Sequence, residues 1–531
     1  MFCVRSTVWH RMEDVTTSVF PSRLVGAAAG LLAAGVALGV SELGAGITGG
    51  RSLVVSVGDW VINHAPDALV EFGKRNFGTD DKAVLVTTVV VLSLVFGALL
   101  GLVARRHFLV GAFGFAAFGV AGFLAALADP LHDAGSAAFA AITGVAAGVV
   151  ALRVLLRAAA LGPKAAIEPA SSAGLERRAF FRLAAGAAVV AAGSALVGHS
   201  LLTSGTRAVA AARRLLRLPP ASNPVALPTA AMDVGVDGVT PLVTANSDFY
   251  RIDTALTFPQ IDYEQWHLRI HGMVSTPFAV TFEDLAAMEL IEQYATIQCV
   301  SNDVGGNLVS TAAWRGVRLR DLLARAGVVG DADQVVGRSV EGFTVGFPAS
   351  AALDDRGAMV AIGMNGVPLP IEHGFPARLI VPGLYGYVSA TKWLSDIELT
   401  RFDRYDAYWV QRGWTQQGPI ETQSRIDVPV SGRELRAKTV AVAGVAWAPT
   451  RGIAKVEVQV DEGSWHEATL ADALSRDTWR QWVYHWSATP GDHRLRVRAT
   501  ESTGALQEAL DQPPGPSGAT GYHTVNVTVT R

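Results

Sequence analysis

Five apolar runs in the first two hundred residues constrain the fold of this chain more than any other feature. They cover residues 24–40, 83–104, 108–128, 136–156 and 180–202. A helix needs about 20 apolar residues to cross a bilayer, and all the runs except the short first one reach this length. We therefore expect residues 1–205 to form a membrane region with about five transmembrane helices.

The charges between these runs predict an orientation. Basic residues gather before the first run, between the second and third, and between the fourth and fifth, whereas the other loops are acidic. Because cytoplasmic loops are enriched in Lys and Arg, we expect a cytoplasmic N-terminus and an extracytoplasmic C-terminal half. The basic residues are Arg5, Arg11, Arg23, Arg105, Arg106, Arg153, Arg157, Lys164, Arg177 and Arg178, and the acidic ones are Asp59, Asp67, Asp80, Asp81, Asp129 and Asp133.

The fifth run follows a pair of arginines. Arg177 and Arg178 are followed by Phe180 and Phe181 and then by an Ala/Val/Gly-rich stretch. This arrangement is typical of a twin-arginine export signal, a route that carries folded proteins. No convincing small-residue cleavage site follows, so we expect the signal to remain as an anchor.

The second half of the chain has the composition of a soluble protein. Prolines 219 and 220 interrupt any continuing helix, which predicts a linker over residues 206–238. Residues 239–430 then mix strand and helix patterns, as in an α+β domain. Thr281 is a candidate helix cap, and the amphipathic stretch 318–326 ends at Gly327.

The last part of the chain, residues 435–531, predicts an all-β domain. Residues 455–460, 494–498 and 525–529 alternate apolar and polar side chains, which is typical of half-buried strands. We expect an immunoglobulin-like sandwich. The tryptophans available for its core are Trp447, Trp465, Trp479, Trp482 and Trp486.

Cys299 separates an apolar run from a polar, glycine-rich loop. The chain has 2 cysteines, and the other is Cys3, so a Cys-rich zinc site or a disulfide framework is excluded. Three interpretations remain open from the residue type: a buried structural thiol, a nucleophile, or a soft ligand of a single redox metal. The formal net charge of -3 argues against a nucleic-acid partner. The absence of a GxGxxG turn after a strand argues against a nucleotide-binding fold.

Several separate blocks around Cys299 resemble the sulfite oxidase family of molybdenum enzymes, and the resemblance covers residues 242–531. The blocks are residues 246–253, 266–272, 299, 314–319, 364–378 and 392–394. The resemblance implies a molybdopterin-binding catalytic domain, a molybdenum cofactor, and a C-terminal dimerisation domain. It also implies that the Cys299 thiolate binds the metal, which suits a soft ligand on a high-valent centre.

The resemblance also implies roles for residues elsewhere in the domain. A terminal phosphate on the cofactor needs cationic donors, and His373, Arg378 and Lys392 match the family's cationic positions around it. Tyr250 and Arg251 join Cys299 as expected catalytic residues. The expected cofactor-binding residues are Asn246, Phe249, Tyr250, Cys299, Ser301, His373, Arg378, Ser389 and Lys392.

The segment after Cys299 departs from the pattern of sulfite oxidases, which carry arginine there. Ser301, Asn302 and Asp303 follow in this chain, and the first cation is Arg315. A sulfite dianion would be poorly held by such a rim. We expect oxygen-atom transfer to or from a small substrate, with sulfite and a neutral S-oxide or N-oxide both open.

The expected partners follow from the missing electron-transfer motifs. The sequence has no CxxCH haem motif, and two cysteines cannot hold an iron–sulfur cluster. His107, His132 and His199 stand near the ends of the apolar runs without an evident partner at matching depth, which argues against a bis-His haem. We expect an external electron carrier or a quinol-linked subunit, and a homodimer formed through the C-terminal domain. The alternative is a non-catalytic membrane receptor or scaffold that retains the fold.

Overall fold

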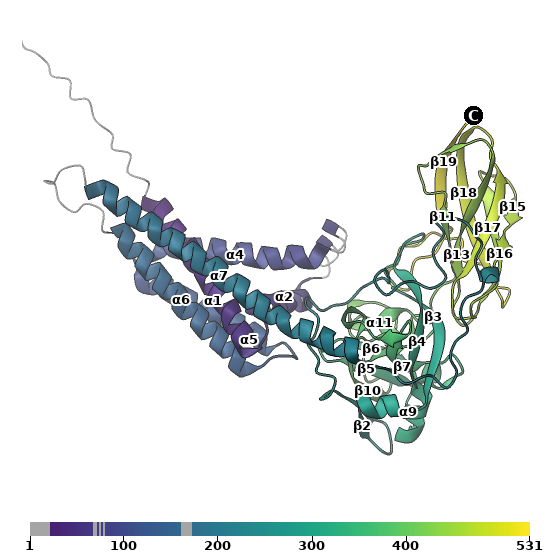
Figure 1. Ribbon diagram of the computed structural model, residues 1–531, viewed down its shortest axis with the longest axis horizontal. Coiled ribbons are helices and arrows are strands. Elements are labelled where there is room, and N and C mark those ends of the chain that lie inside the picture. Colours follow the sequence, from purple (N-terminus) through teal and green to yellow (C-terminus); the bar gives the residue numbers. More distant parts are fainter. Residues whose placement is uncertain (1–21, 67–68, 70–71, 74–75, 78–79, 161–171) are drawn as a thin grey trace, which may run out of the picture. The chain divides into compact units, whose positions relative to one another are not determined.

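The computed structural model describes residues 22–66, 69, 72–73, 76–77, 80–160 and 172–531. It forms two compact units, Met1–Ser204 and Gly205–Arg531 (Figure 1). The predictions that concern Cys3, Arg5, Arg11, Asp67 and Lys164 lie outside the described residues, as do those on the side chain of Arg177.

The first unit is helical. Five of its helices are long and apolar enough to cross a membrane, in agreement with the number of runs predicted from the sequence. An additional short helix, α2, was not predicted, because polar residues such as Ser56 and Asp59 interrupt its apolar pattern. The helices are α1 (Ser22–Thr48), α2 (Leu53–His64), α4 (Asp81–Ala104), α5 (Phe108–Leu127), α6 (Ala134–Ala160) and α7 (Ser172–Leu215).

Glycines bring α1 and α4 into close contact. A Cβ atom at Gly30 would lie 2.7 Å from the Cα atom of Gly101, and one at Gly101 would lie 2.6 Å from the Cα atom of Gly30. Gly26 and Gly97 complete two facing GxxxG patterns, one on each helix. Small residues at this spacing let apolar helices pack backbone against backbone.

Polar side chains gather where α1 ends. Ser52, the N-cap of α2, donates to the Glu42 carboxylate at 2.6 Å, and His199 of α7 lies within electrostatic range of Glu42. Arg51 pairs with both Asp59 and the buried Asp129. These contacts satisfy polar groups that would be costly in an apolar bundle.

Helix α7 differs from its predicted extent. The sequence predicted a linker from residue 206, but the helix continues to Leu215, and Pro219 and Pro220 follow in an irregular segment. This segment belongs to the second unit, within which the Ser222 amide donates to the Leu290 carbonyl at 2.8 Å. The linker prediction is thus wrong for residues 206–215, because the apolar and basic residues there suit a helix as well.

The second unit begins with two central sheets. One has the strand order β2-β1-β10-β5-β6, and the other has the order β3-β4-β7-β8, with β9 also paired to β7. The strands are β1 (His267–Gly272), β2 (Phe278–Thr281), β3 (Leu290–Gln298), β4 (Val309–Arg318), β5 (Gln334–Ser339), β6 (Thr344–Pro348), β7 (Met359–Met364), β8 (Val367–Pro368), β9 (Arg378–Ile380) and β10 (Leu394–Thr400).

Short helices connect these strands. The capping box predicted at Thr281 is present, with Asp284 as its partner, and Gly327 ends α9 in the left-handed region. The helical segments are η2 (Ala230–Met232), α8 (Phe282–Ala287), α9 (Leu319–Ala326), α10 (Ala349–Leu353), η3 (Ile371–His373), α11 (Gly386–Ser389) and η4 (Val410–Arg412).

The β3-β4-β7 sheet is covered on both faces. On β7, Val360 and Ile362 pack in the main central core, whereas Met359 and Ala361 pack in a second cluster on the opposite face. Successive side chains of a strand point to opposite faces, so a strand with no polar face must be buried on both sides. This sheet carries Cys299 at the end of β3 and Arg378 at the start of β9.

Two further sheets share an apolar core in the C-terminal part of the second unit (Figure 1). Their strand orders are β11-β13-β17-β16 and β12-β19-β18-β14-β15. The strands are β11 (Gln423–Val428), β12 (Glu434–Arg436), β13 (Thr439–Trp447), β14 (Ile453–Val460), β15 (Trp465–Glu467), β16 (Thr469–Leu470), β17 (Arg480–Ser487), β18 (Gly491–Glu501) and β19 (Thr524–Thr530).

The tryptophans of this region are distributed differently from the prediction. Trp482 and Trp486 lie in the core between the C-terminal sheets, as expected. Trp447 and Trp479 instead pack in the central core, and the half-buried Trp465 packs edge to face against Tyr522. The prediction of one shared core is therefore wrong for these three residues, because strand alternation does not reveal which neighbouring core a side chain enters.

The glycine contact between α1 and α4 can be tested by Gly30→Val. The added side chain meets backbone atoms of α4, and overpacking of this kind costs about 1–3 kcal/mol. We expect a lower unfolding temperature of the detergent-solubilised protein. The matched control is Gly186→Val on α7, where a Cβ atom meets nothing within 4 Å. Equal effects of the two substitutions would contradict this account of the packing.

Candidate functional site

Cys299 follows β3 directly and begins the loop that leads to β4, residues 299–308, here called the Cys299 loop. The Cys299 amide donates to the Leu308 carbonyl at 2.9 Å, and the Asn302 amide donates to the Cys299 carbonyl at 3.1 Å. The Asn302 side chain accepts from the Leu308 amide at 2.7 Å. These bonds fold the loop back on itself and hold the thiol at 9% exposure.

Tyr250 interacts electrostatically both with the Cys299 thiol and with the buried Arg378. Burial raises the pKa of the Tyr250 hydroxyl, and the neighbouring Cys299 raises it further, so the hydroxyl stays protonated. Burial lowers the pKa of Arg378 to about 10, which still leaves the guanidinium charged at neutral pH. Tyr250 and Cys299, and Tyr250 and Arg378, are thus close enough to interact electrostatically.

Arg378 is a buried cation held by neutral groups. Its guanidinium donates to the carbonyls of His373 at 3.1 Å and Ala390 at 3.4 Å, and it lies 5.1 Å from the centre of the Trp314 ring. A buried charge is costly unless an opposite charge or strong hydrogen bonds compensate it. The surroundings of Arg378 therefore suit an anionic group.

His373 was expected to act as a cationic donor, and the structure gives it a different state. It is buried, its Nε2 atom lies 2.8 Å from the Asn246 carbonyl oxygen, and its ring packs edge-on against Phe249. Burial lowers the pKa of His373 to about 4, so the imidazole is neutral at pH 7. Its Nε2–H then donates to Asn246 and fixes the segment that carries Phe249 and Tyr250.

Lys392 lies close to Arg378 across Gly374. Gly374 has a φ of 109°, and a Cβ atom there would lie 3.0 Å from the Cβ of Lys392 and 3.2 Å from that of Arg378. The Lys392 ammonium donates to Asp253 at 2.9 Å and to the Glu372 carbonyl at 3.1 Å. Glycine is thus required for the two cationic side chains to approach each other.

The remaining predicted residues lie less centrally. Ser389, at the end of α11, donates to the Tyr385 carbonyl at 2.9 Å. Arg251 is 56% exposed, lies 4.0 Å from Asp253, and stacks over the Phe258 ring. Ser301 is exposed on the Cys299 loop. The structure thus connects Asn246, Phe249, Tyr250, Cys299, His373 and Arg378 through contacts and electrostatic interactions, whereas Arg251 and Ser301 are exposed.

Two residues at the site were missed in the sequence. Asn365, at a φ of 49°, donates to the Thr244 carbonyl at 2.9 Å and to the Asn246 side chain at 2.8 Å, so it anchors the same segment as His373. The Asn365-Gly366 pair was a visible turn signal. Tyr385 lies within electrostatic range of Cys299, and burial raises its pKa. No sequence signal distinguished it from other core aromatics.

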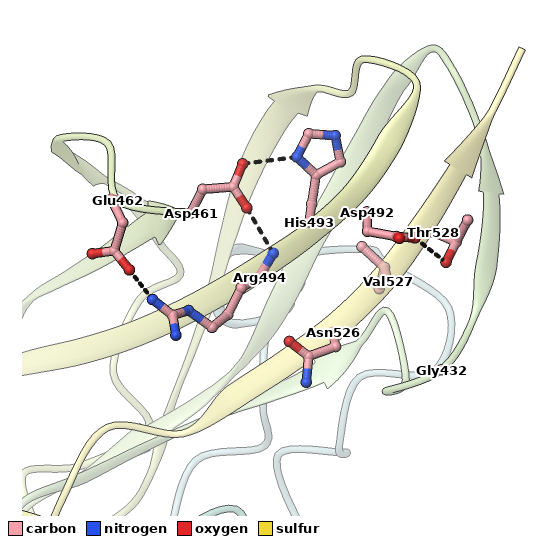
Figure 2. A pocket seen from close by; sticks show the side chains of 9 residues that line it. All are labelled: Gly432, Asp461, Glu462, Asp492, His493, Arg494, Asn526, Val527 and Thr528. Atoms are coloured by element: carbon pink, nitrogen blue, oxygen red, sulfur yellow. Dashed lines mark hydrogen bonds and ion pairs between the residues drawn. The ribbon is translucent and has the colours of Figure 1, made fainter.

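A separate pocket lies on the C-terminal sheets, and Figure 2 shows the residues that line it. Asp461 accepts hydrogen bonds from the His493 ring and the Arg494 amide, each at 2.8 Å. Arg494 pairs with Glu462, and Asp492 accepts from Thr528. None of the predicted site residues lines this pocket, and its charged side chains bind one another.

Comparison with known proteins matches residues 255–409 to the family described as the oxidoreductase molybdopterin binding domain. The uncharacterized oxidoreductase YuiH of Bacillus subtilis (strain 168) is 34% identical over 157 residues, which are 30% of this chain and 76% of that protein. The mitochondrial sulfite oxidase of Macaca fascicularis is 27% identical over 302 residues, which are 48% of this chain and 55% of that protein. The crystal structure of the sulfane dehydrogenase SoxCD from Paracoccus pantotrophus covers 55% of this chain and 82% of that chain, at 22% identity and a TM-score of 0.49.

These matches define a molybdenum-dependent oxidoreductase. The chain belongs to the sulfite oxidase family of molybdopterin oxidoreductases. The matched domain contains Cys299, His373, Arg378, Ser389 and Lys392. The chain spans about half the length of the sulfite oxidases that it matches.

The neutral state of His373 predicts a pH dependence of stability. The ordinary pKa of histidine is 6.5 and that of buried His373 is about 4, so the unfolded chain binds the proton more readily. The contribution of neutral His373 to the free energy of unfolding is therefore fully present above about pH 6.5 and is lost as the pH falls toward 4. His373→Gln should remove roughly 1–3 kcal/mol of this loss in the cofactor-free protein.

The measurement is denaturant unfolding between pH 4 and 7, followed by tryptophan fluorescence. His267→Gln, on the exposed side of β1, is the control and should leave the pH dependence of wild type. If the free energy of unfolding of His373→Gln depended on pH as steeply as that of wild type, the neutral imidazole would be contradicted.

Proposed function

We propose that this chain is a membrane-anchored molybdopterin oxidoreductase that transfers an oxygen atom to or from a small substrate on the extracytoplasmic side. The observation that carries the proposal is the group formed by Cys299, Tyr250 and Arg378. The Cys299 thiol and the Arg378 guanidinium, which is hydrogen-bonded to two carbonyl groups, both lie within electrostatic range of the Tyr250 hydroxyl. A thiol and a buried cation that both interact with one tyrosine match a cofactor that needs both a soft metal ligand and an anion site.

The residues of this group have distinct roles. The molybdenum cofactor, when bound, supplies a metal that changes its oxidation state by two electrons as an oxygen atom is transferred. Cys299 is the thiolate ligand of that metal, and Arg378 and Lys392 hold the anionic end of the cofactor. Ser389 belongs to the same cofactor-binding set.

Tyr250 and the segment around it cover the metal side of the site. The Tyr250 hydroxyl stays protonated because burial and the nearby thiol raise its pKa, so it is a hydrogen-bond donor throughout the reaction. His373, through Asn246, positions this segment, and Phe249 packs between His373 and Trp314. Arg251 lies in the same segment and is a candidate for contacting the substrate once the segment closes.

The charges near the Cys299 loop favour a neutral substrate, such as an S-oxide or N-oxide, over sulfite. Arg315, the first cation after Cys299 in the sequence, lies further along the β3–β4 pair, where it binds Glu292 at 2.9 Å, and therefore does not line the loop. Arg425 reaches the loop but pairs with Asp427 at 2.6 Å. A cation already neutralised by a carboxylate attracts a sulfite dianion weakly. Reduction of a neutral S-oxide would consume two electrons and two protons and release water.

Support for the location comes from the first unit. Its five long apolar helices are consistent with a membrane protein, and the alternation of basic and acidic loops favours an extracytoplasmic second unit. We propose that the twin-arginine stretch exports the folded second unit and is retained as an anchor. The two C-terminal sheets, which share an apolar core, are proposed to form an immunoglobulin-like sandwich that dimerises. Electrons are exchanged with an external carrier or a quinol-linked subunit.

Metal analysis of the purified protein tests this function. We expect about one molybdenum per wild-type chain and an electron paramagnetic resonance signal during reductive titration. Cys299→Ser replaces a soft ligand with a hard one, so its signal should change and its activity should fall by at least about 100-fold. Cys3→Ser is the control and should behave as wild type.

The outcomes separate the two functions that the sequence left open. Wild-type protein without molybdenum, after expression in a host that makes the cofactor, would favour the receptor or scaffold. With molybdenum present, reduction of dimethyl sulfoxide or trimethylamine N-oxide by a viologen dye, compared with oxidation of sulfite, identifies the substrate class.

Arg378→Gln tests the anion site. The substitution removes a buried charge that is bound by carbonyl groups. The unfolding temperature of the cofactor-free variant should therefore be at least as high as that of wild type. The same variant should lose about 10-fold or more of its molybdenum content, because an anionic cofactor loses a charge-assisted hydrogen bond. Arg320→Gln, at an exposed pair with Asp355, should change neither quantity. Retained molybdenum in Arg378→Gln would contradict the assignment.

A further inference from the structure

The residue before Cys299 is held by the C-terminal sheets. Gln298 is fully buried, at 0% exposure. Its side-chain oxygen accepts from the Trp447 indole N–H at 2.7 Å, and its side-chain nitrogen donates to Gln423 at 3.2 Å. Trp447 lies on β13 and Gln423 on β11, so both partners belong to one C-terminal sheet. A buried amide with both ends bonded has little freedom to move.

The far side of the Cys299 loop is held by the same region. Arg425 of β11 donates to the Gly306 carbonyl at 2.7 Å and to Thr240 at 2.6 Å. His523 lies against Gly305, where a Cβ atom would approach within 2.9 Å of the imidazole Cγ. The His523 Nδ1 atom accepts from the Ile426 amide at 3.0 Å, which fixes the ring. The loop is therefore fixed on both sides of the thiol.

A third contact lies further back along β3. Thr296 donates its amide to the Asp477 carbonyl at 2.9 Å and accepts from the Trp479 amide at 2.8 Å. Trp447 and Trp479, which were expected in the core of the C-terminal domain, thus pack into the core beneath β3. The polar ends of these contacts all fall within a few residues of Cys299.

Simple packing between two regions would not require this pattern. An apolar side chain at position 298 would fill the same space, whereas an amide there is stable only while Trp447 and Gln423 satisfy it. A metal site requires its ligand to be held within about 0.5 Å of the productive position. Because Gln298 and Cys299 are adjacent in the chain, fixing the Gln298 side-chain amide also limits the movement of the Cys299 thiol.

We propose that Trp447 and Arg425 are positioning residues for the Cys299 thiol, so that the C-terminal sheets help to build the metal site in addition to their proposed role in dimerisation. Trp447 acts through Gln298 on one side of the thiol, and Arg425 acts through Gly306 on the other. Neither residue touches the cofactor. The inference rests on the proposed function, since it takes Cys299 as the metal ligand.

Trp447→Phe tests the inference. The substitution keeps an aromatic ring and removes the N–H that satisfies Gln298. Trp482→Phe is the matched control, because Trp482 is equally buried on the adjacent strand β17 and its indole N–H has no hydrogen-bond partner among the described residues. Any effect of ring size or of general instability should appear in both variants.

Two readouts are compared in the full-length protein on a Cys3→Ser background. In the holoenzyme, Trp447→Phe should shift the electron paramagnetic resonance signal of molybdenum and lower molybdenum retention about 10-fold. In cofactor-free protein, iodoacetamide should alkylate Cys299 several-fold faster in Trp447→Phe than in wild type. Trp482→Phe should match wild type in both.

The outcomes distinguish the two levels of the proposal. A molybdenum-containing wild type, with Trp447→Phe and Trp482→Phe indistinguishable in signal and alkylation, would overturn the positioning role and leave the proposed function intact. A wild type without molybdenum would overturn the proposed function and the inference with it.

Arg425→Lys provides a second variant in case Trp447→Phe does not fold. Lysine keeps a positive charge beside Asp427 but cannot bind Asp427, Gly306 and Thr240 together. It should change the same two readouts in the same direction. Wild-type values for both would count against the inference.

Discussion

The charge of Arg378 is the constraint on which the site depends. The guanidinium stays protonated in the interior, where burial lowers its pKa only to about 10. Its hydrogen bonds go to the carbonyls of His373 and Ala390, which compensate a cation less fully than a carboxylate does. Such an arrangement is costly for the protein alone and becomes favourable when an anion binds beside it. The stability of the interior and the affinity for an anionic cofactor are therefore linked.

The sheet that carries Cys299 and Arg378 is covered on both faces. Because β7 has no solvent face, the strands beside it cannot slip by one residue without moving polar side chains into a core. Register is thereby fixed: Cys299 follows the end of β3, and Arg378 at the start of β9 is level with Gly316 of β4. Gly374 allows Lys392 and Arg378 to approach each other, where any side chain would separate them. The site is thus a consequence of sheet packing rather than of a flexible loop.

The sequence indicated the family better than it indicated the packing around the candidate site. The resemblance of the blocks that contain Cys299, His373, Arg378 and Lys392 to the sulfite oxidase family implied a molybdopterin domain, which the family match confirms. The burial of His373 in a neutral state was not predictable. A histidine beside two cations is expected to be a third cation unless the burial of its imidazole is known. Helix α2 was missed since its polar residues break the apolar pattern. The inward turn of Trp447 and Trp479 depends on contacts about 150 and 180 residues away in sequence, which no local pattern contains.

The pairing of cations bears on the choice of substrate. At the Cys299 loop, Arg425 is neutralised by Asp427, and beside Arg378 the Lys392 ammonium is bound to Asp253. Arg315, further along the β3–β4 pair, is neutralised by Glu292. These carboxylates hold their partners at 2.6–2.9 Å, so an incoming dianion would have to compete with a charge already in contact. A neutral oxide has fewer binding requirements, since it needs one hydrogen-bond donor at its oxygen and no net positive charge. Tyr250, kept protonated by burial, is a donor of that kind beside the thiol. The proposed function therefore takes a neutral oxygen donor as its substrate, and we propose that the buried Arg378 binds the cofactor rather than the substrate.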